Sequence, residues 1–550
     1  MSFAEEIRSF FKGDVETSAR VRDEYSRDAS LFRIKPELVV FPKDMADVCN
    51  LVSFVAKKKQ EGADISLTAR SGGTDMTGGP LSESIVVVFT RYMNQFRRFM
   101  GEYAVAEPGM YYRDFDKETK KHGLILPSYP ASREICAMGG MVANNAGGEK
   151  NLKYGKTEKY VKKITMVLRD GHPHTFQPLH KAEWEQKMQE DGIEGDIYRQ
   201  MHELLITNHD VIEKARPVVS KNSSGYALWN VFSENHDVFD LTKAIVGSQG
   251  TLGIITEATF QLVRPNPCSA LVILFLDDMT VLGDVIKRVM RYKPESFESY
   301  DDHTFRVAIK YFPEFAMRLK SNFFKLAISF LPEFWMMLTG GVPKLVLLVE
   351  FTSQTKKEAQ SMAEKMEKEI RATLGIRTKI ARTNTEAEKY WVMRRESFNL
   401  LRKRVRGLRA APFIDDFVVK PEYLSEFFPK LEKIINEYND MIYTVAGHMG
   451  DGNFHVIPLM NPKDKRMKQT LREAARRVYD LVLEYHGSIS GEHNDGLIRG
   501  PYVKDMFGKD MYELFLKTKQ IFDPDGIFNP GKKIGVDAEH YLKNLDINST

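Results

Sequence analysis

Residues 447–455, with the sequence GHMGDGNFH, constrain the fold of this chain more than any other stretch. Turn-forming residues separate two apolar, β-prone runs, 442–446 and 454–459. This pattern predicts a tight strand–turn–strand unit. Such a unit brings the imidazoles of His448 and His455 together on one rim. A hairpin whose histidines only form hydrogen bonds is the alternative interpretation.

A second cluster, residues 491–496 with the sequence GEHNDG, follows the helix expected after this unit and favours a metal site. Two imidazoles and one carboxylate make a three-ligand site with an open position, as in catalytic metal centres. We therefore predict that His448, His455 and Glu492 bind a divalent metal. Nitrogen and oxygen ligands favour zinc, with manganese and iron as alternatives. His493 remains free to act as an acid or base.

Length and charge limit the classes of protein to consider. A chain of 550 residues is too long for one core and predicts at least two domains. The net charge of +4, from 79 basic and 75 acidic residues, gives no argument for a nucleic-acid partner.

The three cysteines, Cys49, Cys136 and Cys268, are far apart and form no CxxC pair. They fit a reduced compartment and exclude a cysteine-ligated iron–sulfur cluster within this chain. The first residues are acidic and amphipathic rather than basic and apolar, so no secretory signal is expected. We expect a cytoplasmic location, with peripheral attachment to the inner face of the membrane as the alternative.

The N-terminal part alternates short strands with glycine-rich loops. Residues 3–33 read as helical, followed by strands within 36–42, 65–68 and 85–89 and a helix over 45–59. Between two of these strands, the loop at 69–80 carries two Gly-Gly pairs. Paired glycines allow positive φ and close approach of the backbone to a ligand, and consecutive N–H groups can bind phosphate. A flexible surface loop is the simpler alternative.

Two further loops have the same character, 135–148 and 247–255, and the second leads into a strand. Large side chains are absent where a flat ligand would lie against the backbone. Neither G-x-G-x-x-G after a strand nor the P-loop motif occurs, which disfavours a nicotinamide-binding Rossmann domain and a P-loop domain.

Six motifs in order, ARSGGTDMTGG, MGGMVANNAGG, GSQGTLGIITEAT, GHMGDGNFH, SGEHNDG and DPDGIFNPGK, resemble one family over about residues 36–535. The chain is similar to the FAD-linked dehydrogenases of D-2-hydroxy acids, which act on substrates such as D-lactate, D-2-hydroxyglutarate and glycolate. This family lies within the vanillyl-alcohol oxidase / p-cresol methylhydroxylase flavoprotein superfamily.

The resemblance implies an α+β fold with a two-subdomain, PCMH-type FAD-binding domain. A cap domain with an antiparallel, ferredoxin-like sheet and helices would follow it. The boundaries we expect are a helical segment at 1–35, the FAD-binding domain at 36–266, the cap with its metal site at 267–500, and a C-terminal helix and tail at 501–550 that return to the flavin.

The same resemblance implies FAD contacts in the three glycine-rich loops and in the C-terminal motif DPDGIFNPGK. The positions are Arg70, Ser71, Gly72, Gly73, Thr74, Asp75, Thr77, Gly78, Gly79, Met138, Gly139, Gly140, Ala143, Asn144, Gly147, Gly148, Gly250, Gly253, Ile254, Ile255 and Asn529. The loop at 70–79 has no histidine or cysteine for covalent attachment, so we expect noncovalent FAD.

Two departures from the family pattern stand out. Asn494 occupies a position that is usually glycine, and Gln249 one that is often glutamate. We expect the Asn494 side chain to narrow the pocket beside His493, while the turn itself persists because asparagine tolerates left-handed backbone.

The family motif W-x-x-R, at residues 391–394 here, implies that Arg394 binds the substrate carboxylate, a task that suits a guanidinium fork. Arg395 is expected to be a helix-surface charge, and Asn453 is expected to hydrogen-bond the substrate or its ligand shell. The basic run at 402–406 reads as a solvated face or a partner patch.

The segment 310–341 is aromatic and apolar, but its longest uncharged run is shorter than the ~20 residues of a spanning helix. A buried helical insertion is the simplest interpretation. Peripheral membrane contact or docking of an electron acceptor is the alternative.

The function implied is oxidation of a D-2-hydroxy acid, D-lactate first, to the 2-oxo acid by hydride transfer to FAD. D-2-hydroxyglutarate and glycolate are alternative substrates. An oxygen-using oxidase and a non-catalytic flavin subunit are alternative functions. The partners implied are a small 2-hydroxy carboxylate and a separate electron acceptor, which could be a quinone, a cytochrome or an electron-transfer flavoprotein.

Overall fold

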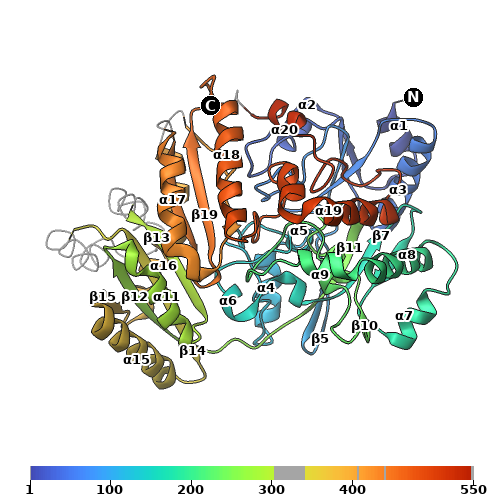
Figure 1. Cartoon of the computed structure of the whole chain (residues 1–550). Helices are drawn as coiled ribbons and strands as arrows, with labels where there is room; N and C mark the ends of the chain where they lie inside the picture. Colours follow the sequence, from blue (N-terminus) through green and yellow to red (C-terminus); the bar gives the residue numbers. More distant parts are fainter. Residues whose placement is uncertain (1, 303–340, 405–407, 439–440, 547–550) are drawn as a thin grey trace.

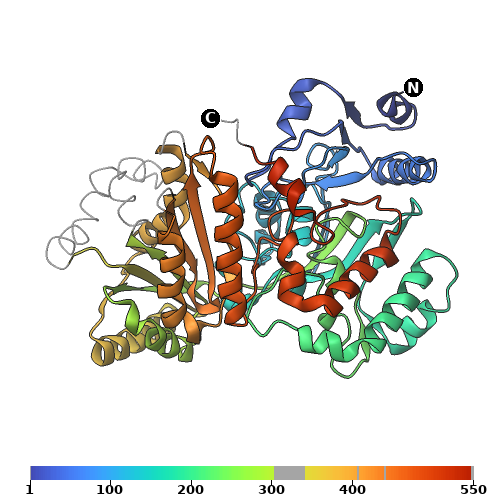
Figure 2. The same cartoon turned by 45° about the horizontal axis from the view of Figure 1, so that its top comes forward.

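The computed structural model describes residues 2–302, 341–404, 408–438 and 441–546. It contains a first domain with two main sheets and a cap with one large sheet, which lie side by side in Figures 1 and 2. The predicted α+β fold is confirmed. The predicted insertion at 310–341 lies outside the described residues, except for Gly341.

The first sheet of the first domain has the order β1-β2-β4-β3, with β2, β4 and β3 parallel and β1 antiparallel. Strands β2 and β4, with the sequences LVVF and IVVV, are fully buried, as expected for strands of a covered parallel sheet. The elements are α1 (Phe3–Arg8), β1 (Asp14–Glu16), α2 (Ala19–Glu24), β2 (Leu38–Phe41), α3 (Met45–Gln60), β3 (Leu67–Arg70) and β4 (Ile85–Val88).

The second sheet is antiparallel, in the order β5-β6-β11-β7-β8. Its core also contains the C-terminal helix α19 (Val503–Phe522), which packs against α8 and α9 (Figure 1). The other elements are β5 (Phe96–Met100), β6 (Tyr103–Ala106), α4 (Tyr112–Lys120), α5 (Met138–Asn144), α6 (Asn151–Tyr154), β7 (Val161–Val167), β8 (Pro173–Phe176), β9 (Leu179–His180), α7 (Lys181–Lys187), α8 (Ile193–Thr207), α9 (His209–Ala215), β10 (Val238–Phe239), α10 (Thr242–Ile245) and β11 (Ile254–Gln261).

The cap sheet is antiparallel, in the order β15-β12-β14-β13-β18-β19-β16, with β17 also pairing with β19. Its first four strands have the split β-α-β order expected for a ferredoxin-like sheet. The strands are β12 (Cys268–Leu276), β13 (Ser296–Asp301), β14 (Leu345–Ser353), β15 (Arg377–Ile380), β16 (Arg409–Ala410), β17 (Phe417–Val418), β18 (Ile442–His448) and β19 (Asn453–Met460).

Alternation along β12 sends its side chains to two different cores. Val272 and Leu274 pack in the core under α11, α15, α17 and α18, whereas Leu271 and Ile273 pack with α16 on the opposite face. The cap therefore has helices on both faces of its sheet. They are α11 (Leu282–Arg291), α15 (Lys356–Leu374), α16 (Asn384–Arg404), α17 (Leu424–Asn436) and α18 (Met467–Glu484), and a last short helix, α20 (Ala538–Lys543), follows near the C-terminus.

Two local predictions were wrong. The segment 3–33 is not helical throughout, because β1 pairs with the buried strand β2, and sheet pairing overrides local helix propensity. Residues of the predicted loop at 135–148 form helix α5, whose small residues allow close packing. A Cβ on Gly139 would lie 2.5 Å from the Cβ of Pro108. None of the described helices combines the length and apolar character needed to cross a membrane.

Candidate functional site

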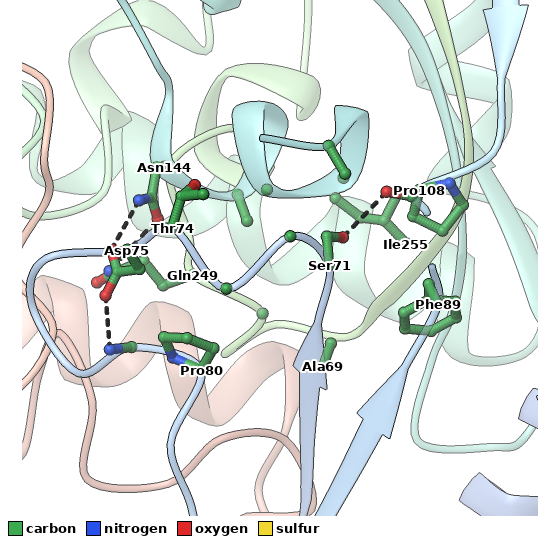
Figure 3. A pocket seen from close by; sticks show the side chains of 18 of the residues that line it. Ala69, Ser71, Thr74, Asp75, Pro80, Phe89, Pro108, Asn144, Gln249 and Ile255 are labelled. Carbon is green, nitrogen blue, oxygen red and sulfur yellow. Dashed lines mark hydrogen bonds between the residues drawn. The ribbon is translucent and has the colours of Figure 1, made fainter. Parts of the chain in front are cut away.

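A cleft of about 730 Å³, including its open mouth, lies between the two subdomains of the first domain (Figure 3). The loops after β3, before α5 and before β11 form its walls. Predicted residues that line it are Ser71, Gly72, Gly73, Thr74, Asp75, Gly79, Gly139, Gly140, Ala143, Asn144, Gly250, Gly253 and Ile255. Residues that we did not predict also line it, and these are Ala69, Pro80, Phe89, Pro108, Ala137 and Gln249.

The carboxylate of Asp75 holds these loops together. It accepts hydrogen bonds from the backbone N–H of Gly79 at 2.8 Å and from the amide of Asn144 at 2.8 Å (Figure 3). It also accepts one from the hydroxyl of Thr77 at 2.7 Å. Gly72 is required by close packing, because a Cβ there would lie 2.6 Å from the carbonyl oxygen of Ile135. The cleft is therefore built from backbone and small side chains, as a flat cofactor requires.

Other predicted contacts are not among the residues that line the cleft. They are Arg70, Thr77, Gly78, Met138, Gly147, Gly148, Ile254 and Asn529. Arg70 points to the N-terminal segment and donates to the carbonyl of Arg27 at 2.7 Å. The Asn529 amide donates to the carbonyls of Gly79 at 3.0 Å and Gln249 at 2.8 Å, so it clamps two cleft loops together.

The cap contributes a compact histidine cluster. His448, His455 and Glu492 each offer a ligand atom, and these atoms lie within 4.8 Å of one another. The hairpin of β18 and β19 places the first two, as the sequence predicts, with Ala446 opposite His455 in the ladder. The three residues are thus close enough together for their ligand atoms to share one ion.

Two buried carboxylates that we did not predict support these imidazoles. Glu298 on β13 lies opposite His448 in the sheet, and its Oε1 is 2.6 Å from His448 Nδ1. Asp415 Oδ1 is 3.0 Å from His455 Nδ1, and its Oδ2 is 2.6 Å from His493 Nδ1. Each imidazole therefore keeps its Nε2 for a ligand or a proton.

The charges of the cluster are strongly coupled. Burial lowers the pKa of His448, but Glu298 and Glu492 outweigh it and raise that pKa to about 9. Burial likewise lowers the pKa of His493, and Asp415 and Asp416 raise it to about 9. By contrast, burial dominates for His455 and lowers its pKa. Burial raises the pKa of Glu492, yet His448 and Lys221 hold it well below its usual range.

Lys221 is a buried cation of the first domain that reaches into the cap cluster. Its Nζ lies 2.6 Å from Glu492 Oε1, 3.0 Å from Asp451 Oδ2 and 3.4 Å from Asn453 Oδ1. The Asn453 amide N–H groups are directed to Asp416 and to the carbonyl of Phe417. The Oδ1 atom of Asn453 is therefore the polar atom of this side chain that faces Lys221.

The two adjacent arginines of α16 have different partners. Arg394 lies toward the cluster, with Nη2 3.2 Å from Glu298 Oε2, and its buried Nε–H has no hydrogen-bond partner within the described part of the chain. Arg395 forms a two-point ion pair with Glu149 of the first domain, at 2.8 and 3.0 Å. The expectation that Arg395 is a helix-surface charge was wrong, because it connects the cap to the first domain.

Asn494 links the cluster to the cleft. Its backbone is left-handed, with a φ of 69°, as we expected. Its amide donates to the carbonyls of Gly247 at 2.8 Å and Asn144 at 3.3 Å, and its Oδ1 accepts from Lys533. The side chain binds the cleft loops rather than lying beside the His493 ring. His493 is therefore one residue away from a direct contact with the cleft wall.

The residues of the cleft fit FAD, and the residues of the cluster fit a divalent cation, the two groups that the sequence implies. The cleft is lined by small side chains and has space at Gly140, where a Cβ would be 3.7 Å from its nearest neighbour. The cluster combines imidazole and carboxylate donors, and a divalent cation would release the proton that the raised pKa of His448 keeps on that ring.

Comparisons with known proteins agree with this division of the chain. Residues 36–177 match the FAD binding domain family model, and residues 266–533 match the model of the C-terminal domain of FAD linked oxidases. Among solved structures, p-cresol methylhydroxylase is similar with a TM-score of 0.66 and 14% identity, over 98% of this chain and 96% of that one. The fold is therefore similar to that of p-cresol methylhydroxylase.

Curated relatives are similar over nearly the whole chain. D-2-hydroxyglutarate dehydrogenase of Pseudomonas putida is 27% identical over 96% of this chain, and the chain spans only 51% of that protein's length. Glycolate oxidase subunit GlcD of Bacillus subtilis is 25% identical, with 94% of this chain and 92% of that protein covered. D-lactate dehydrogenase of Archaeoglobus fulgidus is 25% identical, with 90% and 91% covered.

Proposed function

Because this chain belongs to the FAD-linked oxidases, we propose that it is an FAD-dependent dehydrogenase that oxidises a D-2-hydroxy acid to the 2-oxo acid, with D-lactate as the preferred substrate. The observation that carries the proposal is the position of His493. Its Nδ1 is held by Asp415, and the next residue, Asn494, bonds to the wall of the cofactor cleft. An acid–base group and a hydride-acceptor site therefore adjoin each other.

The residues divide the chemistry among them. FAD supplies the hydride acceptor when bound, and a divalent cation supplies a Lewis acid for the substrate hydroxyl. His448, His455 and Glu492 would hold the cation. His493 accepts the hydroxyl proton at Nε2, and a cation beside it favours the neutral ring that this step needs. Arg394 binds the substrate carboxylate through its unpartnered Nε–H.

The choice among 2-hydroxy acids is best decided by a substrate panel. The purified protein, loaded with FAD and zinc, would be mixed without oxygen with D-lactate, D-2-hydroxyglutarate, glycolate and the L-enantiomers. We expect the D-acids to bleach the flavin, with D-lactate fastest. D-2-hydroxyglutarate is the second candidate, because dehydrogenases of that acid are among the relatives found. Bleaching by none of these acids, or by L-acids alone, would contradict the proposal.

Reoxidation of the reduced flavin, the second half of the reaction, tests the type of electron acceptor. We propose a separate acceptor, such as a quinone, a cytochrome or an electron-transfer flavoprotein. The reduced protein should be reoxidised much faster by an artificial dye than by dissolved oxygen. Faster reoxidation by oxygen would favour the oxidase alternative.

We further propose that FAD is bound noncovalently, since the described residues that line the cleft include no histidine, cysteine or tyrosine. The purified protein should be yellow, and acid precipitation should leave the flavin in the supernatant. Flavin absorbance that remains with the precipitated chain would contradict this prediction.

A further inference from the structure

Asp415 is a single carboxylate that serves two histidines with different roles. Its side chain is fully buried, and its two oxygens lie 3.0 Å from His455 Nδ1 and 2.6 Å from His493 Nδ1. The third histidine, His448, has a carboxylate of its own in Glu298. Asp415 is thus shared by two imidazoles, whereas Glu298 contacts one imidazole, that of His448, and pairs with Arg394.

We propose that Asp415 is a positioning residue that couples metal binding to proton transfer, an inference that rests on the proposed function. A carboxylate that accepts from both Nδ1 atoms requires a hydrogen on each of them. When both rings are neutral, both Nε2 atoms carry lone pairs, one for the cation at His455 and one for the substrate proton at His493. Loss of this carboxylate would therefore disturb both roles together.

The backbone around Asp415 is fixed, so its carboxylate can act as a rigid reference. Arg499, fully buried, donates to the Asp415 carbonyl at 2.5 Å. The next residue, Asp416, has a φ of 68°, and its carboxylate accepts from the backbone N–H groups of Glu492 and His493 at 2.9 and 2.7 Å. The same dipeptide thus holds the ring of His493 and the backbone that carries it.

A second metal site is the alternative interpretation, because Asp415, His455 and His493 also place ligand atoms within 4.8 Å of one another. Chemistry favours the positioning role. A neutral imidazole binds a metal through one nitrogen and keeps a hydrogen on the other. One nitrogen of His455 would bind the cation that it shares with His448 and Glu492. Its other nitrogen could bind a second cation only by losing that hydrogen.

The test compares Asp415→Asn with Glu298→Gln in the full-length flavoprotein. Asparagine keeps the size of the side chain, but its amide nitrogen cannot accept, so one of the two imidazoles loses its acceptor. Glutamine at 298 disturbs a proposed ligand and leaves His493 and Asp415 intact. Zinc affinity would be measured by titration against a competing chelator, and the limiting rate of flavin reduction by stopped flow with saturating zinc and D-2-hydroxy acid.

We expect both variants to lose about 10–100-fold in zinc affinity. Only Asp415→Asn should also slow flavin reduction at saturating zinc, on the order of 10²-fold. Wild-type zinc affinity and reduction rate in Asp415→Asn would overturn the proposal. Two zinc ions per wild-type chain would also overturn it.

Folding and the proposed function are tested separately. If Asp415→Asn fails to retain FAD, Asp415→Glu keeps both acceptors and takes its place. Compared with Asp415→Ala, Asp415→Glu should recover part of the zinc affinity and part of the reduction rate. The absence of any recovery would overturn the proposal. If no hydroxy acid reduces the flavin of the wild type, the proposed function fails. Zinc affinity then still tests the role of Asp415, because an unchanged affinity in the variants would overturn that role.

Discussion

Glu492 and His493 are adjacent in the chain, but their side chains face different partners. Glu492 Oε1 lies 2.6 Å from Lys221 and 3.4 Å from His448, whereas His493 is held by Asp415. Glu492→Gln keeps the shape but removes a charge that helps hold a dication, so bound metal should fall. His493→Ala should keep metal and FAD, while flavin reduction slows by about 10²–10⁴-fold.

Metal analysis beside stopped-flow reduction separates these two roles. A metal-replete His493→Ala protein with wild-type reduction would remove this residue as the base. Metal loss in the same variant would instead make His493 a ligand.

Lys221 makes a different prediction, because it neutralises two buried carboxylates, Glu492 and Asp451, before any metal binds. Lys221→Met leaves both without their cation, which typically costs ~3–5 kcal/mol in a buried site. A dication supplies the missing charge, so zinc should raise the melting temperature more in Lys221→Met than in the wild type. Lys533→Met, which removes a buried lysine from Asp495, is the matched control.

Thermal unfolding with and without zinc measures both variants. An equal zinc-induced rise in Lys221→Met and in the wild type would show that Lys221 does not neutralise the metal ligands. The control should be destabilised without gaining a larger response to zinc.

Only part of this site could be predicted from the sequence. The two histidines and Glu492 stand in glycine-rich motifs with short spacing. Glu298, Asp415 and Lys221 lie in segments without such motifs, and they reach the cluster through sheet pairing and domain packing. Helical periodicity also could not show which of two adjacent arginines faces the site. Arg394 lies toward the cluster, and its role in binding a carboxylate stays a prediction, whereas the prediction about Arg395 was wrong.

At the scale of elements, the hairpin of β18 and β19 is confirmed, because two apolar runs flank a glycine-rich turn. Short elements failed, because their structure depends on contacts distant in sequence. Strand β1 exists through its pairing with β2, and α5 through its packing against Pro108.

Strand β14 carries a testable electrostatic strain at Glu350. Burial, together with the nearby Glu295 and Glu149, raises the pKa of this half-buried carboxyl to about 7, although Lys150 opposes the shift. The pKa of Glu350 is higher in the folded state than its ordinary value. The contribution of this carboxyl to stability is therefore present below about pH 4.5 and is lost as the pH rises through 7. Glu350→Gln should therefore stabilise the protein at pH 8, by about 1–2 kcal/mol after allowance for exposure.

Denaturant unfolding at pH 8 and pH 5 measures this difference, which should be several-fold smaller at the lower pH. Glu358→Gln, on the exposed first turn of α15, is a control without a buried carboxyl. A stabilisation of equal size at both pH values would indicate a packing effect in place of the electrostatic one.

For the whole molecule, function depends on how the cap is held against the first domain. The proposed hydride acceptor lies in the first domain, and the proposed metal ligands lie in the cap. Besides the pairs that Lys221 makes with Glu492 and Asp451, further ion pairs of the described residues cross this boundary. Lys150 and Lys153 bond to Glu295 at 2.9 and 2.8 Å, and Arg395 bonds to Glu149 through two points.

Arg395→Met tests whether this boundary sets the geometry of the reaction. The variant should retain FAD and zinc, because Arg395 contacts neither the cleft nor the cluster. Flavin reduction at saturating substrate should nevertheless fall by about 10-fold or more, since small misplacements of reacting groups have large effects on rate. Arg288→Met is the matched control, because Arg288 and Glu369 form a pair of similar exposure within the cap. If both variants reduce their flavin equally fast, the ion pair stabilises the protein without orienting the two halves of the site.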